Sequence, residues 1–424
     1  MSIDTNRAAG RERARRRWKA TALAGGLLSL VASFASCAVA ENDSRREEPG
    51  TTVPEAAPAD VAVLPDSGAE PDAGCEPGDP DCTTEVASCD DVAWCMVPTP
   101  LDVLKTFTAV WGTGPNDVWA IGSGGTIMHY DGETWVETPS GVLDTLNAIW
   151  GSGPNDIWIV STTTTILHGT GFKDGTAVWT LSPTGFSPWN SAFIRAAWGT
   201  SPDDVRLGGR MYDLADPDWD NGLWAGNQLL LVPGDGGTAW KQVPGTATIR
   251  SIWGSSASNV WMAADNSTSV STERGLLLHG TPREGGAGEG QDPLVWTSID
   301  SQSSLTFDAV WGSGPDDVWA VGALGSIRHY LTGNVRFDKV PSGTTAPLHA
   351  IWGSGPKDIW VVGDAGTILH YDGTAFTPSA AQLPLGRKPN LYGVWGSSAN
   401  DVWIVGDGVA LHYTGPKSGN GGTK

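Results

Sequence analysis

The stretch AVWGTGPNDVWAIGSGGTIMHYDGETW, residues 109–135, carries the pattern that decides the fold. It contains four short apolar or β-branched runs, the first beginning at Thr108, and Gly-Pro-Asn, Ser-Gly-Gly and Asp-Gly separate them. These separators are typical of tight turns, because Gly, Asn and Asp accept turn backbone angles and Pro presets one of them. The segment therefore predicts one antiparallel sheet of four short strands.

The same pattern recurs along most of the chain. Its first Trp, followed by Gly, appears in seven copies at Trp111, Trp150, Trp198, Trp253, Trp311, Trp352 and Trp395. Four strands in roughly 40–50 residues is the period of a β-propeller blade. The repeat count therefore predicts an all-β, seven-bladed β-propeller.

The seventh copy ends before its fourth strand, and a matching strand lies near the other end of the chain. In Val92–Pro98, a Pro follows Trp94 by four residues, as Pro139 follows Trp135 in the first copy. We therefore expect the N-terminal strand to complete the last blade and close the ring, which would remove exposed sheet edges.

Recurrence also separates architecture from function. Most Trp residues fall at three repeat positions, and aromatic residues at such positions are expected to pack blade against blade. Six of the seven His share one position: His129, His168, His279, His329, His370 and His412. We expect them to hydrogen-bond to the repeated turn residue, which is Asp117, Asp156, Asp204, Asn259, Asp317, Asp358 or Asp401.

Composition limits the partners. The 424 residues carry 26 Lys+Arg against 47 Asp+Glu, a formal net charge of −21. Because phosphate binding needs a basic face, this charge argues against nucleic acid as a partner.

The N-terminal part has the features of an export address. Residues 1–40 combine an arginine-rich start with a short apolar run, which predicts a signal peptide. Two processing sites are compatible with it: lipidation at Cys37, or cleavage after Ala40. The first predicts an outer-membrane or cell-surface lipoprotein that meets the membrane only through its lipid anchor, and the second a periplasmic or secreted protein.

The remaining segments follow from composition. Residues 41–88 are acidic, rich in Pro and Ala and free of aromatic residues, which predicts a disordered tether. Residues 89–415 are assigned to the propeller and 416–424 to a flexible tail. Two disulfides, with three possible connectivities, are expected among the four cysteines left in an exported chain, namely Cys75, Cys82, Cys89 and Cys95.

The repeats resemble those of exported bacterial Trp-rich propeller proteins, often lipoproteins, which are loosely grouped with BNR-like and WD-repeat-like propellers. They are also distantly similar to tectonin-type lectin propellers, which share the Val-Trp and Gly-x-Ile motifs. The resemblance covers about residues 92–415 and implies the propeller fold, whereas propellers serve many functions.

The third and fourth copies depart from the pattern. Insertions at 210–228 and 265–275 lengthen the connections between their second and third strands, which should lie on one face. The aromatic residues gathered in this region predict a ligand site on the loops of blades 3 and 4, made of Trp189, Trp219, Trp224 and Tyr212. The alternative is that these side chains only pin long loops onto the ring.

The insertion in the third copy also resembles part of a calcium loop. Asp216, Asp218 and Asp220 alternate along it, and alternate carboxylates can converge on one hard cation. The acid expected at the twelfth position of such a loop is replaced by Asn227, so a solvated acidic turn is the alternative. No cofactor is otherwise required.

No enzyme motif accompanies the repeats. Asp131–Trp135 is one residue short of a sialidase Asp-box, and arginines such as Arg195, Arg250, Arg328 and Arg387 fall at unmatched places. The sequence therefore predicts a monomeric, non-enzymatic binding propeller for an extracellular or envelope protein or glycan. The alternatives are a glycan-active hydrolase or lyase and an envelope assembly scaffold. Arginines or carboxylates clustered at the channel mouth would favour an enzyme, and an exposed aromatic patch a binder.

Overall fold

The computed structural model describes Cys75 and residues 78–416, except 103, 186–189, 214–223, 235–236, 246, 267–274 and 289–290. The predicted signal peptide, most of the predicted tether and nearly all of the predicted tail therefore lie outside the described residues. The side chains of 190–191, 212–213, 224–226 and 237 are not described either.

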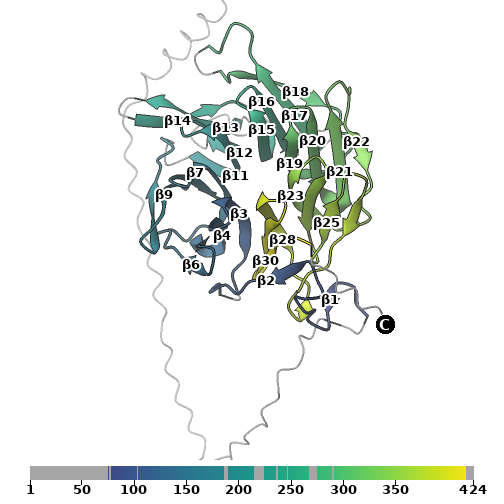
Figure 1. Ribbon diagram of the computed structural model, residues 1–424. Coiled ribbons are helices and arrows are strands. Elements are labelled where there is room, and N and C mark those ends of the chain that lie inside the picture. Colours follow the sequence, from purple (N-terminus) through teal and green to yellow (C-terminus); the bar gives the residue numbers. More distant parts are fainter. Residues whose placement is uncertain are drawn as a thin grey trace, which may run out of the picture. The chain divides into compact units, whose positions relative to one another are not determined.

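The described chain forms seven four-stranded antiparallel sheets, the blades of a β-propeller, as the repeats predicted (Figure 1). Blade 1 consists of β3 (Phe107–Gly114), β4 (Asp117–Gly122), β5 (Ile127–Tyr130) and β6 (Trp135–Glu137). Blade 2 consists of β7 (Leu146–Gly153), β8 (Asp156–Ser161), β9 (Ile166–Lys173) and β10 (Thr176–Leu181). Blade 3 consists of β11 (Asn190–Ser201), β12 (Asp204–Asp213), β13 (Trp224–Gly234) and β14 (Gly237–Val243).

Blades 4 to 6 follow the same order. They are β15 (Thr248–Ser256), β16 (Asn259–Asp265), β17 (Gly275–Pro282) and β18 (Leu294–Ile299); β19 (Phe307–Gly314), β20 (Asp317–Gly322), β21 (Ser326–Leu331) and β22 (Asp338–Val340); and β23 (Leu348–Gly355), β24 (Asp358–Gly363), β25 (Ile368–Tyr371) and β26 (Phe376–Pro378). Single 3-10 turns follow two second strands, η1 (Ser123–Gly125) and η3 (Ala323–Gly325).

Blade 7 combines strands from both ends of the described chain. It contains β28 (Leu391–Ser398), β29 (Asp401–Gly406) and β30 (Val409–Tyr413), and its fourth strand is β2 (Trp94–Met96). Trp94 pairs with Tyr413 and Met96 with Leu411. The N-terminal strand thus stands where the Trp-Pro spacing placed it.

The segment before β2 corrects the predicted tether. β1 (Cys82–Thr83) pairs with β27 (Gly386–Arg387), and the backbone N–H of Lys388 donates to the carbonyl of Asp81. Within residues 78–88, assigned to the tether on composition, Asp81 to Thr83 therefore contact the propeller through backbone hydrogen bonds, and Cys82 is buried. The cysteine connectivity left open by the sequence is Cys75–Cys82 and Cys89–Cys95.

The first-strand Trp residues pack between blades, as expected. Each ring lies against the Gly that follows the first Trp of the next blade, so that a Cβ at Gly112 would come within 2.8 Å of the Trp395 ring. The same contact joins Gly151 to Trp111 and recurs around the ring. The Trp-Gly pair thus recurs because the glycine leaves the space that a neighbouring indole fills.

A second aromatic contact joins neighbouring blades farther from the centre. The fourth-strand aromatic of one blade lies edge-on to the second-strand Trp of the blade before it, as in Trp179 on Trp119 and Trp135 on Trp403. Blade 3 has Arg206 in place of that Trp, and the guanidinium carbon of Arg206 lies 5.4 Å from the centroid of the Trp296 ring.

The predicted His hydrogen bonds are present. His Nε2 lies 2.9 Å from the carboxylate of Asp117 in blade 1, and the equivalent pairs occur in blades 2, 5, 6 and 7. In blade 4 the partner of His279 is Asn259, at 2.8 Å. Because no carboxylate offsets burial there, the pKa of His279 is lowered. Asp204 of blade 3 accepts a hydrogen bond from Thr200.

Candidate functional site

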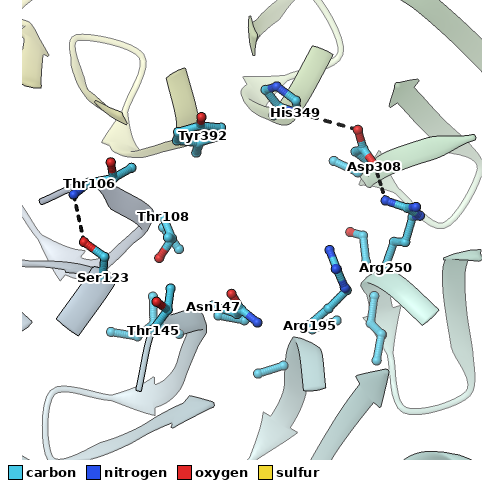
Figure 2. Close-up of a pocket in the computed structure, with 18 of the residues that line it drawn as sticks. Thr106, Thr108, Ser123, Thr145, Asn147, Arg195, Arg250, Asp308, His349 and Tyr392 are labelled. Carbon is cyan, nitrogen blue, oxygen red and sulfur yellow. Dashed lines mark hydrogen bonds and ion pairs between the residues drawn. The ribbon is translucent and has the colours of Figure 1, made fainter. Parts of the chain in front are cut away.

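A polar cavity of about 690 Å³ opens at the centre of the propeller, where the innermost strands begin (Figure 2). Residues of all seven blades line the cavity, because each innermost strand contributes residues at or near its N-terminal end. Asp265 at the end of β16 and Asp407 after β29 stand at this same mouth, so it lies on the face where second strands end.

Seven of the lining or adjoining residues hold one repeat position, three residues before the first Trp. They are Thr108, Asn147, Arg195, Arg250, Asp308, His349 and Tyr392, which we call the channel ring. In every blade, the register between the first and second strands shifts by one residue at this position, which is a β-bulge. A bulge releases its extra residue from the ladder and re-aims the side chain, and bulges are frequent beside functional sites.

The ring was missed by the sequence analysis. By residue type, Arg195 and Arg250 fall at unmatched places in the sequence, whereas in the structure they occupy equivalent positions in blades 3 and 4. The sequence signal for the ring is variation at one repeat position. The seven copies agree before and after this position, and the seven residues at it all differ except for the two arginines.

Charged ring residues form a connected network across blades 4 to 6. Arg250 donates to Asp308 at 2.9 Å and to Asp265 at 3.2 Å. His349 lies 2.6 Å from Asp364 through Nε2 and 3.6 Å from Asp308 through Nδ1. Asp308 therefore bridges an arginine and a histidine on the two blades beside its own.

The network changes the titration of His349. Burial alone would lower the pKa of His349, but Asp308 and Asp364 outweigh burial and raise the pKa above 6.5. The protonated imidazole, with both nitrogens as donors, is therefore favoured at the pH where an isolated histidine loses its proton.

We expect a rise in pH to destabilise the chain through this residue. A folded pKa above 6.5 gives stability that is complete below 6.5 and is lost as pH rises through the folded pKa. The His349→Gln variant lacks this titration, so its deficit in melting temperature against wild type should shrink between about pH 6 and about pH 9. Thermal unfolding across that range measures it, and a constant deficit would contradict the assignment.

Arg195 stands apart from the network. Its side chain is exposed to the cavity, and no hydrogen bond or ion pair joins it to another described residue. Desolvation by the channel walls, followed by the adjacent Arg250 cation, lowers the pKa of Arg195. Of the two arginines in the ring, Arg250 has its charge offset by carboxylates, whereas Arg195 faces the cavity without a carboxylate partner among the described residues.

The neutral ring residues tie neighbouring blades together. Thr108 donates to the carbonyl of Leu146, and Asn147 donates through Nδ2 to the carbonyl of Ile194 at 3.0 Å. The Tyr392 ring lies 5.3 Å from that of His349. This side of the mouth offers hydroxyl, amide and aromatic surface to a ligand.

Most of the charged side chains of the ring are engaged with one another. Asp308 and Asp364 are held by cations, and His349 is held by both carboxylates. Within the described residues, no Ser, Thr or Cys hydroxyl or thiol is hydrogen-bonded to His349, as an activated nucleophile requires. The arginine and carboxylate cluster that was expected to favour an enzyme is present, but all of its charged groups except Arg195 are paired with one another.

The residues predicted from sequence to form a ligand site lie only partly among the residues that the structure describes. Trp189 and Trp219 lie outside the described residues, and Tyr212 and Trp224 pair with each other across β12 and β13, their side chains not being described. Asp216, Asp218 and Asp220 also lie outside, and the described part of the chain holds no group of three potential metal ligands. Nor do the described residues include a helix long and apolar enough to cross a membrane.

Neither a protein-family model nor a curated protein matches the chain. Among solved structures, YCF48 from Cyanidioschyzon merolae is similar, with a TM-score of 0.55 and 18% identity over 76% of this chain and 98% of that one. A structure of YCF48 bound to D1 peptide is similar too, with a TM-score of 0.56 and 16% identity over 79% of this chain and 99% of that one. At such identities the likeness shows the fold alone, a β-propeller.

Proposed function

We propose that the chain is a non-catalytic binding propeller that holds a peptide segment of another protein at the channel mouth. The channel ring carries this proposal, because seven bulges aim seven mostly different side chains into one cavity of a framework that otherwise repeats. The structure of YCF48 with D1 peptide supports it, since that propeller of similar fold holds a peptide.

A glycan-active hydrolase or lyase is the second candidate, and one observation favours it. Arg195, Arg250, Asp308 and His349 gather at the mouth on four consecutive blades. Glycoside hydrolysis uses a carboxylic acid and a second carboxylate that stay available to the sugar. Because Arg250 and His349 engage Asp308, and His349 engages Asp364, binding accounts better for this arrangement.

The test selects ligands from a phage-displayed random peptide library on the immobilised full chain. Thr145 lines the cavity, and its side chain makes no hydrogen bond to another described residue, so Thr145→Trp should block the mouth without breaking the ring. We expect Thr145→Trp to weaken the selected peptides by tenfold or more, an order of magnitude typical of lost pocket complementarity. Val335→Trp, at an 88% exposed position of an outer turn, is the matched control. Equal binding by both variants would reject the mouth as the site.

The loops of blades 3 and 4 enter the proposal as a rim of the same site. We propose that Trp189, Tyr212, Trp219 and Trp224 contact the peptide, or a glycan, next to the mouth, because β12 and β16 end on that face. A Trp219→Ala/Trp224→Ala double variant, screened on the peptides and on a glycan array with and without calcium, tests this contact. Calcium-dependent binding would support a cation at Asp216, Asp218 and Asp220.

Export remains part of the proposal. We infer a monomeric chain at the cell surface or in the envelope, lipidated at Cys37 or cleaved after Ala40, with an envelope assembly partner as the broader alternative. The two disulfides support it, since such bonds persist in oxidising compartments. Mass spectrometry of the mature N-terminus distinguishes a lipid-modified Cys37 from a free Glu41.

A further inference from the structure

Arg195 and Arg250 occupy the same bulge in neighbouring blades and differ in their partners. Arg250 donates to Asp308 and Asp265, which offset its charge inside the ring. The guanidinium of Arg195 has no such partner within the described residues. Its five N–H donors form a planar fork that matches the two oxygens of a carboxylate.

We propose that Arg195 binds a carboxylate group of the peptide that the channel mouth holds, and so determines the class of ligand. This inference rests on the proposed function. An incoming carboxylate satisfies the donors of Arg195 and reduces its repulsion from Arg250. Burial first, and then this repulsion, lower the pKa of Arg195.

The surroundings favour a single carboxylate over a polyanion. Opposite Arg195, the mouth carries Asp407, and Asp364 lies behind His349 with 35% of its side chain exposed. The chain as a whole carries a net charge of −21, which repels a ligand with many negative charges. A peptide that presents one carboxylate, from its C-terminus or from an Asp or Glu side chain, satisfies Arg195 and avoids the acidic side.

Asn147 supplies a second polar contact beside Arg195. Its Nδ2 donates to the carbonyl of Ile194, the residue before Arg195, and this bond fixes the orientation of the amide. Its Oδ1 accepts no hydrogen bond within the described residues, and Asn147 faces the same open space as Arg195 (Figure 2). An amide oxygen there can accept a peptide N–H next to the bound carboxylate.

The cavity is large enough for this mode. Its volume of about 690 Å³ falls within the roughly 300–1,000 Å³ of small-ligand sites, so it admits a few residues of an extended chain rather than a folded domain. Thr108, Thr145 and Ser251 line it with hydroxyl groups, which suits a peptide backbone.

The first experiment measures binding of selected peptides, each made as a free acid and as a C-terminal amide, to the full chain. We expect Arg195→Met to weaken the carboxylate-bearing peptides by about ten- to a hundredfold, the range for a charge-assisted hydrogen bond. Arg336→Met, at an exposed outer position, should leave them unchanged. Loss on amidation assigns the carboxylate to the C-terminus, and Arg195-dependent binding of amides that contain Asp or Glu assigns it to a side chain. Equal binding of all forms by wild type and Arg195→Met would overturn the inference and leave the peptide site standing.

A second measurement does not need a selected peptide. N-acetylglycine, a minimal carboxylate with one amide, is titrated into the full chain while the arginine Nε–H signals are followed by nuclear magnetic resonance. We expect the signal that Arg195→Met removes to shift and that of Arg336 to stay. If the Arg195 signal shifts but the library selection yields no peptide that binds at the mouth, the proposed function is rejected and the anion site stands. An unmoved Arg195 signal would overturn the inference.

Discussion

The Asp292→Ala variant should lose about 3–5 kcal/mol of unfolding free energy, the usual cost of leaving a buried charge unpaired. Arg206 and Asp292 are each only 6% exposed, and the guanidinium meets both carboxylate oxygens at 2.8 and 3.0 Å. Asp292 also accepts hydrogen bonds from Trp296 Nε1 and from the backbone N–H of Leu294. Denaturant titration of wild type and variant measures the loss.

The control for Asp292→Ala removes both charges together. An Arg206→Met/Asp292→Leu double variant leaves no unpaired ion but removes the acceptor of Trp296 Nε1 and of the Leu294 N–H, so its loss should be smaller than that of Asp292→Ala without vanishing. Acid gives an independent check, since burial raises but Arg206 and Trp296 together lower the pKa of Asp292 below 3.8. Its stabilisation is present above 3.8 and is lost as pH falls through the folded pKa. A loss under about 1 kcal/mol in Asp292→Ala would show that Arg206 finds other partners.

The buried pair also explains why blade 3 departs from the repeat. In six blades the second-strand Trp contacts an aromatic residue of the next blade, and in blade 3 Arg206 stands in place of that Trp. An arginine at that place keeps contact with the Trp296 ring but brings a charge, which Asp292 neutralises from the next blade. Arg206, which breaks the sequence repeat, thus has a structural role, while the candidate functional residues lie in the channel ring.

The framework could be predicted because each blade solves the same packing problem with the same residues. Trp111 and Gly112 recur since one indole must fit over one glycine at every blade junction. His129 and Asp117 recur because they join strands two and three of each sheet. Recurrence therefore identified the blades, the strand at Trp94 and the histidine partners from one sequence.

The channel ring could not be found in the same way. Arg195, Asp308 and Tyr392 differ in charge, size and chemistry, so no pattern of residue types joins them. What joins them is a one-residue bulge in the register of two strands, and this bulge has no fixed residue type from blade to blade. Aligning the seven copies by place rather than by residue type would have brought them together.

The Trp94→Ala variant should be the most damaging substitution in a fourth strand, with a loss of about 3–5 kcal/mol or more. Trp94 is fully buried, lies edge-on to Trp360 with ring centroids 4.9 Å apart, and is 5.4 Å from Tyr413. Its strand β2 has three residues and pairs with β30, and the other three strands of this sheet, β28 to β30, lie more than 290 residues away from β2 in the sequence. No connecting turn holds β2 in its sheet, so side-chain packing at Trp94 must offset the entropy of ordering the N-terminal segment.

Trp240→Ala is the matched control, because Trp240 holds the same position in blade 3, is 8% exposed and lies on a strand that follows β13 closely in the sequence. Its turn keeps the strand nearby after truncation, so we expect a smaller loss and little change in the protection of other blades. In Trp94→Ala, amide hydrogen exchange should rise in β2, β30 and the facing strands of blade 1, since Trp403 of blade 7 packs on Trp135 of blade 1. Equal losses in the two variants, with unchanged exchange in blade 1, would mean that the displaced strand adds no more to the ring than any other fourth strand does.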